Sequence, residues 1–344
     1  MTERVRPSMQ TIASEVGVSK ATVSRALRNL PGLSEPVRTR ILDTARRLGY
    51  VKHPLISAMM SDVRFKKTST FSPVVALLHC LPWERAKDLH INMRLLRQKA
   101  REHASNLGYS LEEFYLKEPG MTPKRMIEII KARGIRGIIF EHFFENDVKL
   151  DIDLSEFASV AIGFTLTSPN LHRVVVDQYN GLLLAIRKLQ ILGYRRMGVV
   201  IPGLNESFTN FKREAALHIA HQSMPESDRI PILIYSNRPN QSVFKKWLDE
   251  YKPEVILAMH IDLLDRLQDL GYRIPDDIGF VHLGWHKSYT SCAGIAPNWD
   301  QVGIAATNQV IDQLNRNEFG VPQKPLITLI EGEWIDGPSV LKRT

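Results

Sequence analysis

The sequence predicts a small helical module followed by an α/β body that is built from two doubly wound subdomains. Three observations support this prediction. Residues 9–48 show helical periodicity in three short segments, strand-like and helical segments alternate from Val74 onward, and the excess of positive charge lies in the first 70 residues. A chain of 344 residues has room for two or three domains and for a core that needs no disulfides.

The charge distribution sets the module apart from the body. Residues 1–70 contain 13 Lys and Arg against 5 Asp and Glu, so they carry the whole net charge of +8, and residues 71–344 hold 32 of each sign. Concentrated positive charge favours a polyanionic partner, and nucleic acid is the first to consider. A neutral body suits a sensing domain, because a basic one would bind DNA without regard to sequence.

Each of the three segments in the module has apolar residues one helical turn apart. Ile12 and Val16 predict the first helix, and Gly17 is expected to end it. Ser19 and Ser34 are expected to cap the N-termini of the second and third helices. Two helices that meet at a short glycine turn have the spacing of a helix-turn-helix, whose second helix enters the major groove of DNA.

The outward side of the second predicted helix carries groups suited to DNA. Arg25 can donate two hydrogen bonds to guanine, and Lys20 can also reach a base edge. The hydroxyls of Ser19, Thr22 and Ser24 suit phosphate oxygens, which position a protein without reading sequence. A three-helix domain that binds protein is the alternative interpretation.

The body alternates strand-like and helical segments. Strands are predicted over residues 74–79, 111–116, 137–140, 160–164, 174–176, 197–201, 232–235, 255–259 and 278–283. Helices are predicted over residues 91–107, 123–133, 178–192, 209–221, 242–251 and 262–270. This alternation favours parallel sheets, and so many units suit two sheets better than one.

The helix-turn-helix segment carries a specific motif. Residues 11–27 read TIASEVGVSKATVSRAL, followed by Asn29, Ser34, Arg38, Ile41 and the run Leu48-Gly49-Tyr50. This pattern resembles the LacI/GalR family of bacterial regulators. The resemblance implies a homodimeric transcription regulator that binds pseudo-palindromic operator DNA, and it favours a repressor. It also implies that a small molecule, such as a sugar or a related metabolite, modulates operator affinity from a cleft in the body.

The same resemblance gives a role to the segment after Tyr50. In the family this position holds a hinge helix, which orders on DNA and inserts an apolar side chain into the minor groove. Counting from Tyr50 places Met59 there, whereas the family's usual Ala-Arg pair is Ile56-Ser57 in this chain. The alternative is a linker whose methionines pack on the body. The candidate DNA-binding residues are Ser8, Ser19, Lys20, Ala21, Thr22, Ser24, Arg25, Arg28, Asn29, Ser34 and Met59.

The body resembles the family's effector domain, which has the type I periplasmic-binding-protein fold. The matching signals are Asp177 with Gly181, the segment LGYRRMG at 192–198 and the segment GYRIPDDIGFV at 271–281. The resemblance implies a DNA-binding domain over 1–53, a hinge helix and linker over 54–72, and an effector-binding and dimerisation domain over 73–344. Subdomain 1 is expected to hold 73–193 and 294–326, and subdomain 2 to hold 194–293 and 327–344, with crossings near Gly193, Gly294 and Leu326.

Small ligands in such folds bind between the subdomains, at the C-terminal ends of strands. The candidate effector-binding residues on the corresponding loops are Trp83, His142, Phe164, Asp177, Phe208, Lys212, Arg213, His260, Asp262, Trp285 and His286. The aromatic side chains among them could stack on a sugar ring. For each of them, packing in the core is the alternative.

Several of these positions depart from the family pattern. The family's clamping arginine is Lys212 here, with Arg213 one step along the chain. Asp262 is what remains of an Asn-Asp pair, and Trp285-His286 stands where Phe-Asp is usual. The loss of these polar anchors argues against a standard sugar effector. It leaves open a bulkier or more apolar ligand, or a constitutive DNA-binding regulator with a vestigial, ligand-free cleft.

The sequence lacks the motifs of common enzyme classes and of metal sites. It has no P-loop, no dinucleotide-binding glycine motif after a strand, no nucleophile elbow and no zinc-protease motif, so we expect no enzyme, no cofactor and no bound metal. The histidine pairs at 218/221 and 282/286 each lack a third ligand. Without a long apolar run or a signal peptide, the sequence predicts a cytoplasmic protein, and the family resemblance implies a bacterial one.

Overall fold

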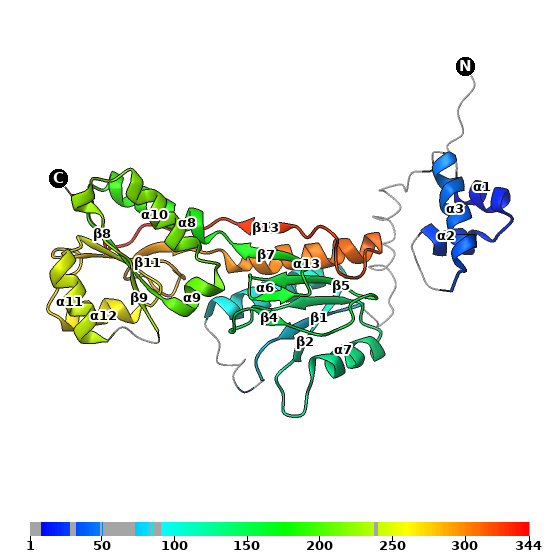
Figure 1. Cartoon of the computed structure of the whole chain (residues 1–344), viewed down its shortest axis with the longest axis horizontal. Helices are drawn as coiled ribbons and strands as arrows, with labels where there is room; N and C mark the ends of the chain where they lie inside the picture. Colours follow the sequence, from blue (N-terminus) through cyan, green and yellow to red (C-terminus); the bar gives the residue numbers. More distant parts are fainter. Residues whose placement is uncertain are drawn as a thin grey trace, which may run out of the picture.

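The fold is that of a three-helix module followed by an α/β body of two lobes (Figure 1). The computed structural model describes residues 8–27, 32–48, 50, 73–82, 84, 91–236 and 240–343. The structure confirms the fold class that the sequence predicts, a helical module followed by two doubly wound α/β subdomains. Across the ranges just given, no helix is both long and apolar enough to cross a membrane.

The N-terminal module consists of α1 (Met9–Val16), α2 (Lys20–Leu27) and α3 (Glu35–Arg47). The apolar faces of the three helices meet in one core, as the helical spacing predicts. The buried members of this core are Ile12, Ala13, Val16, Val23, Ala26, Ile41 and Ala45. Gly17 ends α1 with a φ of 73°, a left-handed conformation that glycine adopts at little cost. A guanidinium nitrogen of Arg40 donates to the carbonyl of Val16 at 2.9 Å, which ties the end of α1 to α3.

The first lobe is built on a parallel sheet in the order β13-β7-β5-β3-β1-β2. Its strands are β1 (Val74–His79), β2 (Ser110–Tyr115), β3 (Gly137–Phe140), β5 (Ala158–Ile162), β7 (His172–Val176) and β13 (Ile327–Ile330). Strands β3 and β5 are buried at every residue, because helices cover both faces of the sheet. Helices α6 (Ile91–Asn106) and α13 (Trp299–Arg316) pack on one face, and α7 (Pro123–Ala132) packs on the other.

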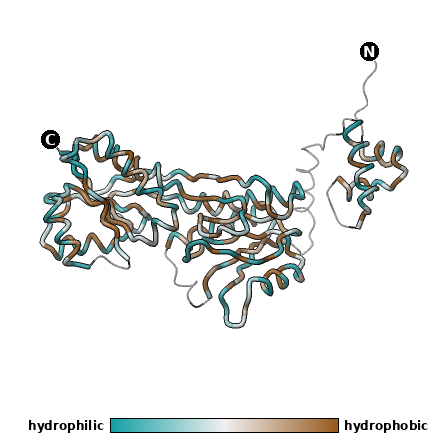
Figure 2. The backbone as a smooth tube through the Cα atoms, viewed as in Figure 1, coloured by the Kyte–Doolittle hydropathy of each residue, from teal (hydrophilic) through white to brown (hydrophobic). Residues whose placement is uncertain are grey.

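The second lobe repeats this design. Its sheet has the order β14-β12-β11-β10-β8-β9, and only the pairing of β12 with β14 is antiparallel among the described strand pairs of this sheet. The strands are β8 (Met197–Pro202), β9 (Leu233–Tyr235), β10 (Val255–Ala258), β11 (Gly279–His282), β12 (Ala293–Ala296) and β14 (Glu333–Ile335). Helices α8 (Gln178–Ile191) and α10 (Lys212–Gln222) cover one face, and α11 (Gln241–Tyr251) and α12 (Asp262–Asp269) cover the other. Figure 2 shows hydrophobic residues concentrated along the strands of this lobe.

The first crossing between the lobes lies earlier than predicted. Helix α8 packs Leu182, Ala185 and Leu189 into the core of the second sheet, so it belongs to the second lobe. The crossing is therefore at Asp177, between β7 and α8, and the prediction of a crossing near Gly193 is wrong. The apolar face of α8 decides its lobe, and the sequence alone does not show which sheet that face covers.

The second and third crossings lie later than predicted. Strand β12 pairs with β11, so the chain leaves the second lobe after Ala296, two residues beyond the Gly294 near which the crossing is predicted. Strand β13 pairs with β7, so the chain leaves the first lobe after Ile330 and not near Leu326. The expected limits of the subdomains are wrong for these residues and for 178–193, because hydrogen bonding between distant strands sets the limits.

Several elements were not predicted from the sequence. They are α9 (Gly203–Phe208), the short pair β4 (Val148–Lys149) and β6 (Leu166–Ser168), and the strands and helix that follow residue 290. The helix predicted over 209–221 begins only at Lys212, because Asn210 and Phe211 take left-handed conformations with φ of 57° and 56°. These two residues separate α9 from α10.

Candidate functional site

The N-terminus of α2 is fixed by the cap that the sequence predicts. The Ser19 hydroxyl accepts a hydrogen bond from the backbone N–H of Thr22 at 3.0 Å, and the two hydroxyls lie 2.8 Å apart. Lys20, Ala21 and Arg25 are exposed on α2, whereas its opposite side is buried in the module core. The helix therefore presents its polar N-terminal side to solvent, as a recognition helix must.

The remaining DNA-binding candidates have differing surroundings. The Ser8 hydroxyl caps α1 in a reciprocal pair with Thr11, so it has a structural role of its own. Ser34 stands at the N-cap position of α3, but its side chain makes no capping hydrogen bond, which corrects the prediction of a side-chain cap. Ser24 is half-buried on α2. Arg28, Asn29 and Met59 lie outside the described residues.

A cavity of about 350 Å³ lies between the two lobes. Residues from both lobes and from the crossing segments line it. They are Asn92, Met93, His142, Phe144, Ile162, Gly163, Phe164, Val175, Val176, Gln178, Phe208, Thr209, Arg213, Met259, His260, His282, Leu283, Gly284, Pro297 and Trp299. The volume is near the lower end of the range for small-molecule sites.

The cavity brings together five of the candidate effector-binding residues, and the structure places five others elsewhere. His142, Phe164, Phe208, Arg213 and His260 line the cavity. Trp83 lies outside the described residues. The candidates that do not line the cavity are Asp177, Lys212, Asp262, Trp285 and His286.

Local contacts explain two of these exceptions, Asp177 and Trp285. Asp177 is buried as the N-cap of α8, where its carboxylate accepts from the backbone N–H of Asn180 at 3.0 Å. The Trp285 indole N–H donates to the carbonyl oxygens of Tyr289 and Cys292, both at 3.0 Å. These side chains hold the backbone in place, and sequence position alone does not reveal such bonds.

Two further exceptions, Asp262 and His286, have side-chain partners of their own. Asp262 begins α12 and pairs with Arg266 one turn later, at 3.6 Å. His286 is buried, with its Nδ1 3.0 Å from the Ser288 hydroxyl. Neither side chain reaches the lining of the cavity.

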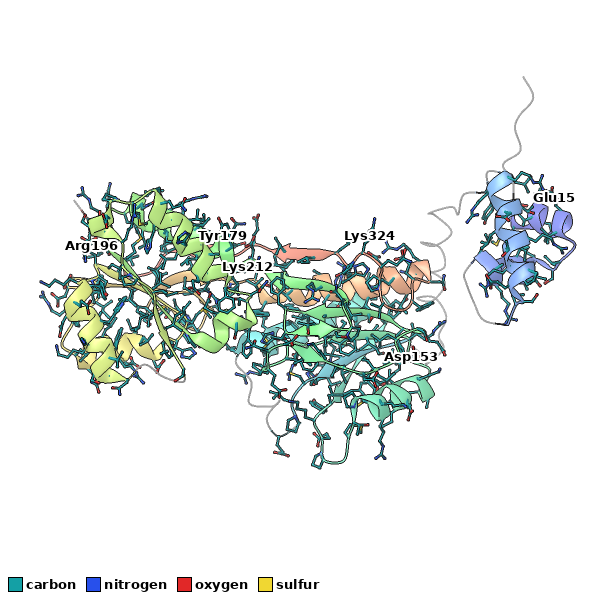
Figure 3. The ribbon with its side chains drawn as sticks, in the orientation of Figure 1. Glu15, Asp153, Tyr179, Arg196, Lys212 and Lys324 are labelled. Carbon is teal, nitrogen blue, oxygen red and sulfur yellow. The ribbon has the colours of Figure 1, made fainter. Side chains whose placement is uncertain are left out.

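Arg213 is the charged side chain among the described residues of the lining. It is buried, and its guanidinium bonds the carboxylate of Glu206 at 2.8 Å and the side-chain oxygen of Gln178. Glu206 also accepts from the backbone N–H of Glu214 at 3.2 Å. The positive charge of Arg213 is therefore already balanced within the second lobe. Lys212, which the alignment with the family pattern favoured, points instead toward the Phe164 ring, 5.9 Å away, at the junction of the lobes (Figure 3).

His142 is a neutral imidazole in an aromatic setting. The rings of Phe144 and Phe208 meet it edge-on, each at a centroid distance of 5.2 Å. Burial lowers the pKa of His142 to about 4, so the ring is uncharged at neutral pH. Gly163 makes this arrangement possible: it has a φ of +83°, and a Cβ there would lie 2.7 Å from the His142 ring.

In the part of the chain that the structure describes, four contacts join the lobes at or near the cavity. The Asn146 amide donates to the Ser207 hydroxyl at 2.6 Å, and the Asn92 amide donates to the carbonyl of Gly284 at 3.4 Å. The ring pair His142–Phe208 and the pair Lys212–Phe164 complete the set. These contacts hold the lobes in one relative orientation.

The crossing segments are bonded to one another next to the cavity. The backbone N–H of Asp177 donates to the carbonyl of Ile330 at 2.8 Å, which joins the first crossing to the third. The Asn298 amide donates to the carbonyl of Glu331 at 2.9 Å, which joins the second crossing to the third. Val176 and Gln178 flank the first crossing, and Pro297 and Trp299 flank the second. All four line the cavity, so a bound molecule would contact these crossing segments directly.

Sequence reasoning missed several residues of the cavity. Gln178 and Trp299 begin α8 and α13, directly after the crossings, and the wrong crossing positions hid them. Asn92 lies in the first turn of α6, a helix predicted correctly, but nothing in its sequence marks it as facing the second lobe. Among the described residues, no three His, Cys, Asp or Glu side chains are placed to hold a metal ion.

The chain is similar in sequence and in fold to known proteins. Residues 8–53 match a family model described as bacterial regulatory proteins, lacI family. Residues 8–53 are thus a LacI-family helix-turn-helix domain. The match covers the three helices whose motif carries the resemblance to the LacI/GalR family, and so confirms it.

Curated proteins similar to this chain are regulators by name. The chain is 22% identical over 293 residues to HTH-type transcriptional regulator DegA of Bacillus subtilis, an alignment that covers 80% of this chain and 81% of DegA. HTH-type transcriptional regulator GntR of Pseudomonas aeruginosa is 41% identical over 56 residues, and the alignment spans only 16% of either chain. A crystal structure of the lac repressor dimer, bound to operator and the anti-inducer ONPF, shares the fold. Its TM-score is 0.58 at 14% identity, over 98% of this chain and 100% of the repressor chain.

Proposed function

We propose that this LacI-family protein is a homodimeric transcription regulator, a repressor, that binds pseudo-palindromic operator DNA. The exposed N-terminal side of α2, with its capped end and its basic residues Lys20 and Arg25, is the observation that carries the proposal. In helix-turn-helix proteins the N-terminal residues of the second helix reach the base edges in the major groove. Two copies related by a two-fold axis would read two half-sites.

We propose a division of roles along the chain. Residues 1–53 bind DNA, residues 54–72 form the hinge helix and linker with Met59 as the minor-groove wedge, and residues 73–344 bind the effector and dimerise. The basic charge of the first 70 residues supports this division. We place the protein in the bacterial cytoplasm, where operator DNA is accessible.

The proposed effector site is the cavity between the lobes. Its lining includes residues beside the first and second crossings, which are hydrogen-bonded to the third, so a ligand bound there touches both lobes and two of the crossing segments. A ligand changes operator affinity only if it binds the two lobe orientations with different affinities. The ligand's contacts with the crossing segments are where this difference in affinity would arise.

Selection from a random-sequence duplex pool tests the proposal. The full-length protein should enrich a pseudo-palindrome whose half-site centres lie about 10 base pairs apart, or a multiple of that spacing. Enrichment of sequences without two-fold symmetry would contradict a symmetric dimer. Failure to enrich any sequence would contradict specific DNA binding.

A second candidate is a constitutive DNA-binding regulator whose cavity takes no ligand. The four contacts across the cavity favour it, since they join the lobes without help from a bound molecule. A thermal-shift screen of carbohydrates and small metabolites separates the two candidates. A saturable rise in melting temperature with any compound excludes the constitutive regulator, because a ligand that binds only the folded state stabilises it.

A further inference from the structure

The hydrogen-bonding groups in the cavity are mostly committed to partners within the protein. Gln178 bonds Arg213, and the Thr209 hydroxyl donates to the carbonyl of Glu206 at 3.1 Å. His260 lies 3.0 Å from the Tyr235 hydroxyl, and His282 lies 2.9 Å from the carbonyl of Met259. Each of these groups has less capacity left for a ligand.

His142 differs from these groups. Within the described ranges, no hydrogen bond reaches either nitrogen of its ring, although the ring lies on the cavity wall. A neutral imidazole offers one N–H donor and one nitrogen acceptor. His142 is thus the side chain best placed to anchor a ligand.

The charge of the lining excludes a strongly charged ligand. The described lining has no Asp or Glu, and the charge of Arg213 is balanced by Glu206 at 2.8 Å. An anion or a cation in the cavity would lose its hydration without gaining a free counter-charge from the described lining residues, which is unfavourable.

The walls favour an aromatic ring. Phe144 and Phe164 from the first lobe, Phe208 from the second, and Trp299 beside the second crossing supply ring faces and edges around the cavity. Ring pairs add stabilisation to the burial of their apolar area. A sugar could also stack on these rings, but its several hydroxyls would outnumber the uncommitted polar side chains. Buried hydroxyls without partners disfavour binding.

We infer that the cavity binds a small neutral phenol, with its ring among the phenylalanines and its hydroxyl bonded to His142. A phenolic hydroxyl can donate to a bare ring nitrogen or accept from a ring N–H, so it can pair with a neutral imidazole in either tautomer. This inference rests on the proposed function, because it names the ligand class of the same effector site. It replaces the sugar that the family resemblance suggests with a planar, largely apolar molecule.

Four probes test the inference on the full-length protein by isothermal titration. Methyl 4-hydroxybenzoate should bind saturably. Methyl 4-methoxybenzoate, which lacks the donor, and the anion 4-hydroxybenzoate should each bind about tenfold more weakly, the size expected for one lost hydrogen bond or an unpaired charge. Glucose should show no binding. Saturable glucose binding, or equal affinity for the hydroxy and methoxy esters, would overturn the inference.

The variant His142→Phe distinguishes the contribution of the hydrogen bond to His142 from that of packing against the aromatic side chains. It keeps a ring between Phe144 and Phe208 but removes the nitrogens, so it should bind both esters with similar affinity. His218→Phe, at an exposed position of α10, is the matched control and should keep the tenfold preference for the hydroxy ester. A preference that survives in His142→Phe would overturn the assignment of His142.

Operator binding measured on the same preparations shows whether a negative result contradicts only the ligand assignment or the proposed DNA-binding function as well. If the protein binds its selected operator but none of the aromatic probes, the inference is wrong and the DNA-binding function stands. If the protein binds no operator at all, the proposed function is wrong, whatever the probes do. Circular dichroism and a cooperative thermal transition establish that the His142→Phe variant is folded.

Discussion

Replacing Glu206 by Gln should destabilise the body by about 3–5 kcal/mol, because it leaves Arg213 buried without a counter-charge. The side chains of Arg213 and Glu206 are 3% and 1% exposed, and they bond at 2.8 Å. Burial lowers the pKa of Arg213, and Glu206 offsets part of this effect. The isosteric amide keeps the shape of Glu206, so the loss reports the charge. At about 2 °C per kcal/mol for a body of this size, the melting temperature should fall by roughly 6–10 °C.

Urea unfolding of four proteins measures this effect. The double variant Glu206→Gln with Arg213→Met should recover most of the lost free energy, since replacing both members of a buried pair is often nearly neutral. Asp249→Asn removes an exposed pair with Lys245, at 2.9 Å, and should cost less than about 1 kcal/mol. A Glu206→Gln variant as stable as Asp249→Asn would refute the claim that Glu206 balances a buried charge.

Three further predictions concern DNA binding and pH. Arg25→Ala should relax base preference and weaken operator binding by about 1–3 kcal/mol; an unchanged set of selected sequences would refute its assignment to base recognition. Met59→Gly should weaken specific binding more than non-specific binding in anisotropy titrations, and equal losses would mean that Met59 inserts no wedge. The body should lose stability above neutral pH through His79. Burial lowers its pKa, but hydrogen bonds to Glu113 at 3.0 Å and Glu141 at 2.7 Å raise it above 6.5 overall. This stabilisation is complete below pH 6.5 and is lost as pH rises through the folded pKa, by up to about 1.4 kcal/mol per pH unit. Urea unfolding from about pH 6 to about pH 9 measures the loss, which should be absent in His79→Gln.

Local signals in the sequence predict the N-terminal module well. Ser19 and Gly17 act through bonds and conformations within a few residues, so their roles follow from their types and positions. The same holds for strands β1 and β3, which are short apolar runs buried on both faces and lie over the predicted residues. Such features need no knowledge of distant contacts.

The cavity depends on contacts between residues far apart in the sequence. Helix α8 looks the same from its sequence whichever lobe it joins, and only the packing of residues such as Leu182 and Leu189 assigns it. Trp285 was a plausible stacking residue, but its indole N–H is bonded to the carbonyls of Tyr289 and Cys292. Whether a polar side chain is committed to a neighbour decides its availability to a ligand, and a single sequence does not carry that information.

The central claim is that a basic helix-turn-helix module gives this chain specific, electrostatically assisted DNA binding. The most direct measurement is the affinity of the full-length protein for its selected operator and for a scrambled duplex, over a salt series from about 50 to 200 mM. Log K should fall linearly with log salt for both duplexes, by roughly 10³–10⁵ over this range if 6–10 phosphates are contacted. The operator should stay at least about 10³-fold tighter. Affinities that do not depend on salt, or that are equal for the two duplexes, would contradict the claim.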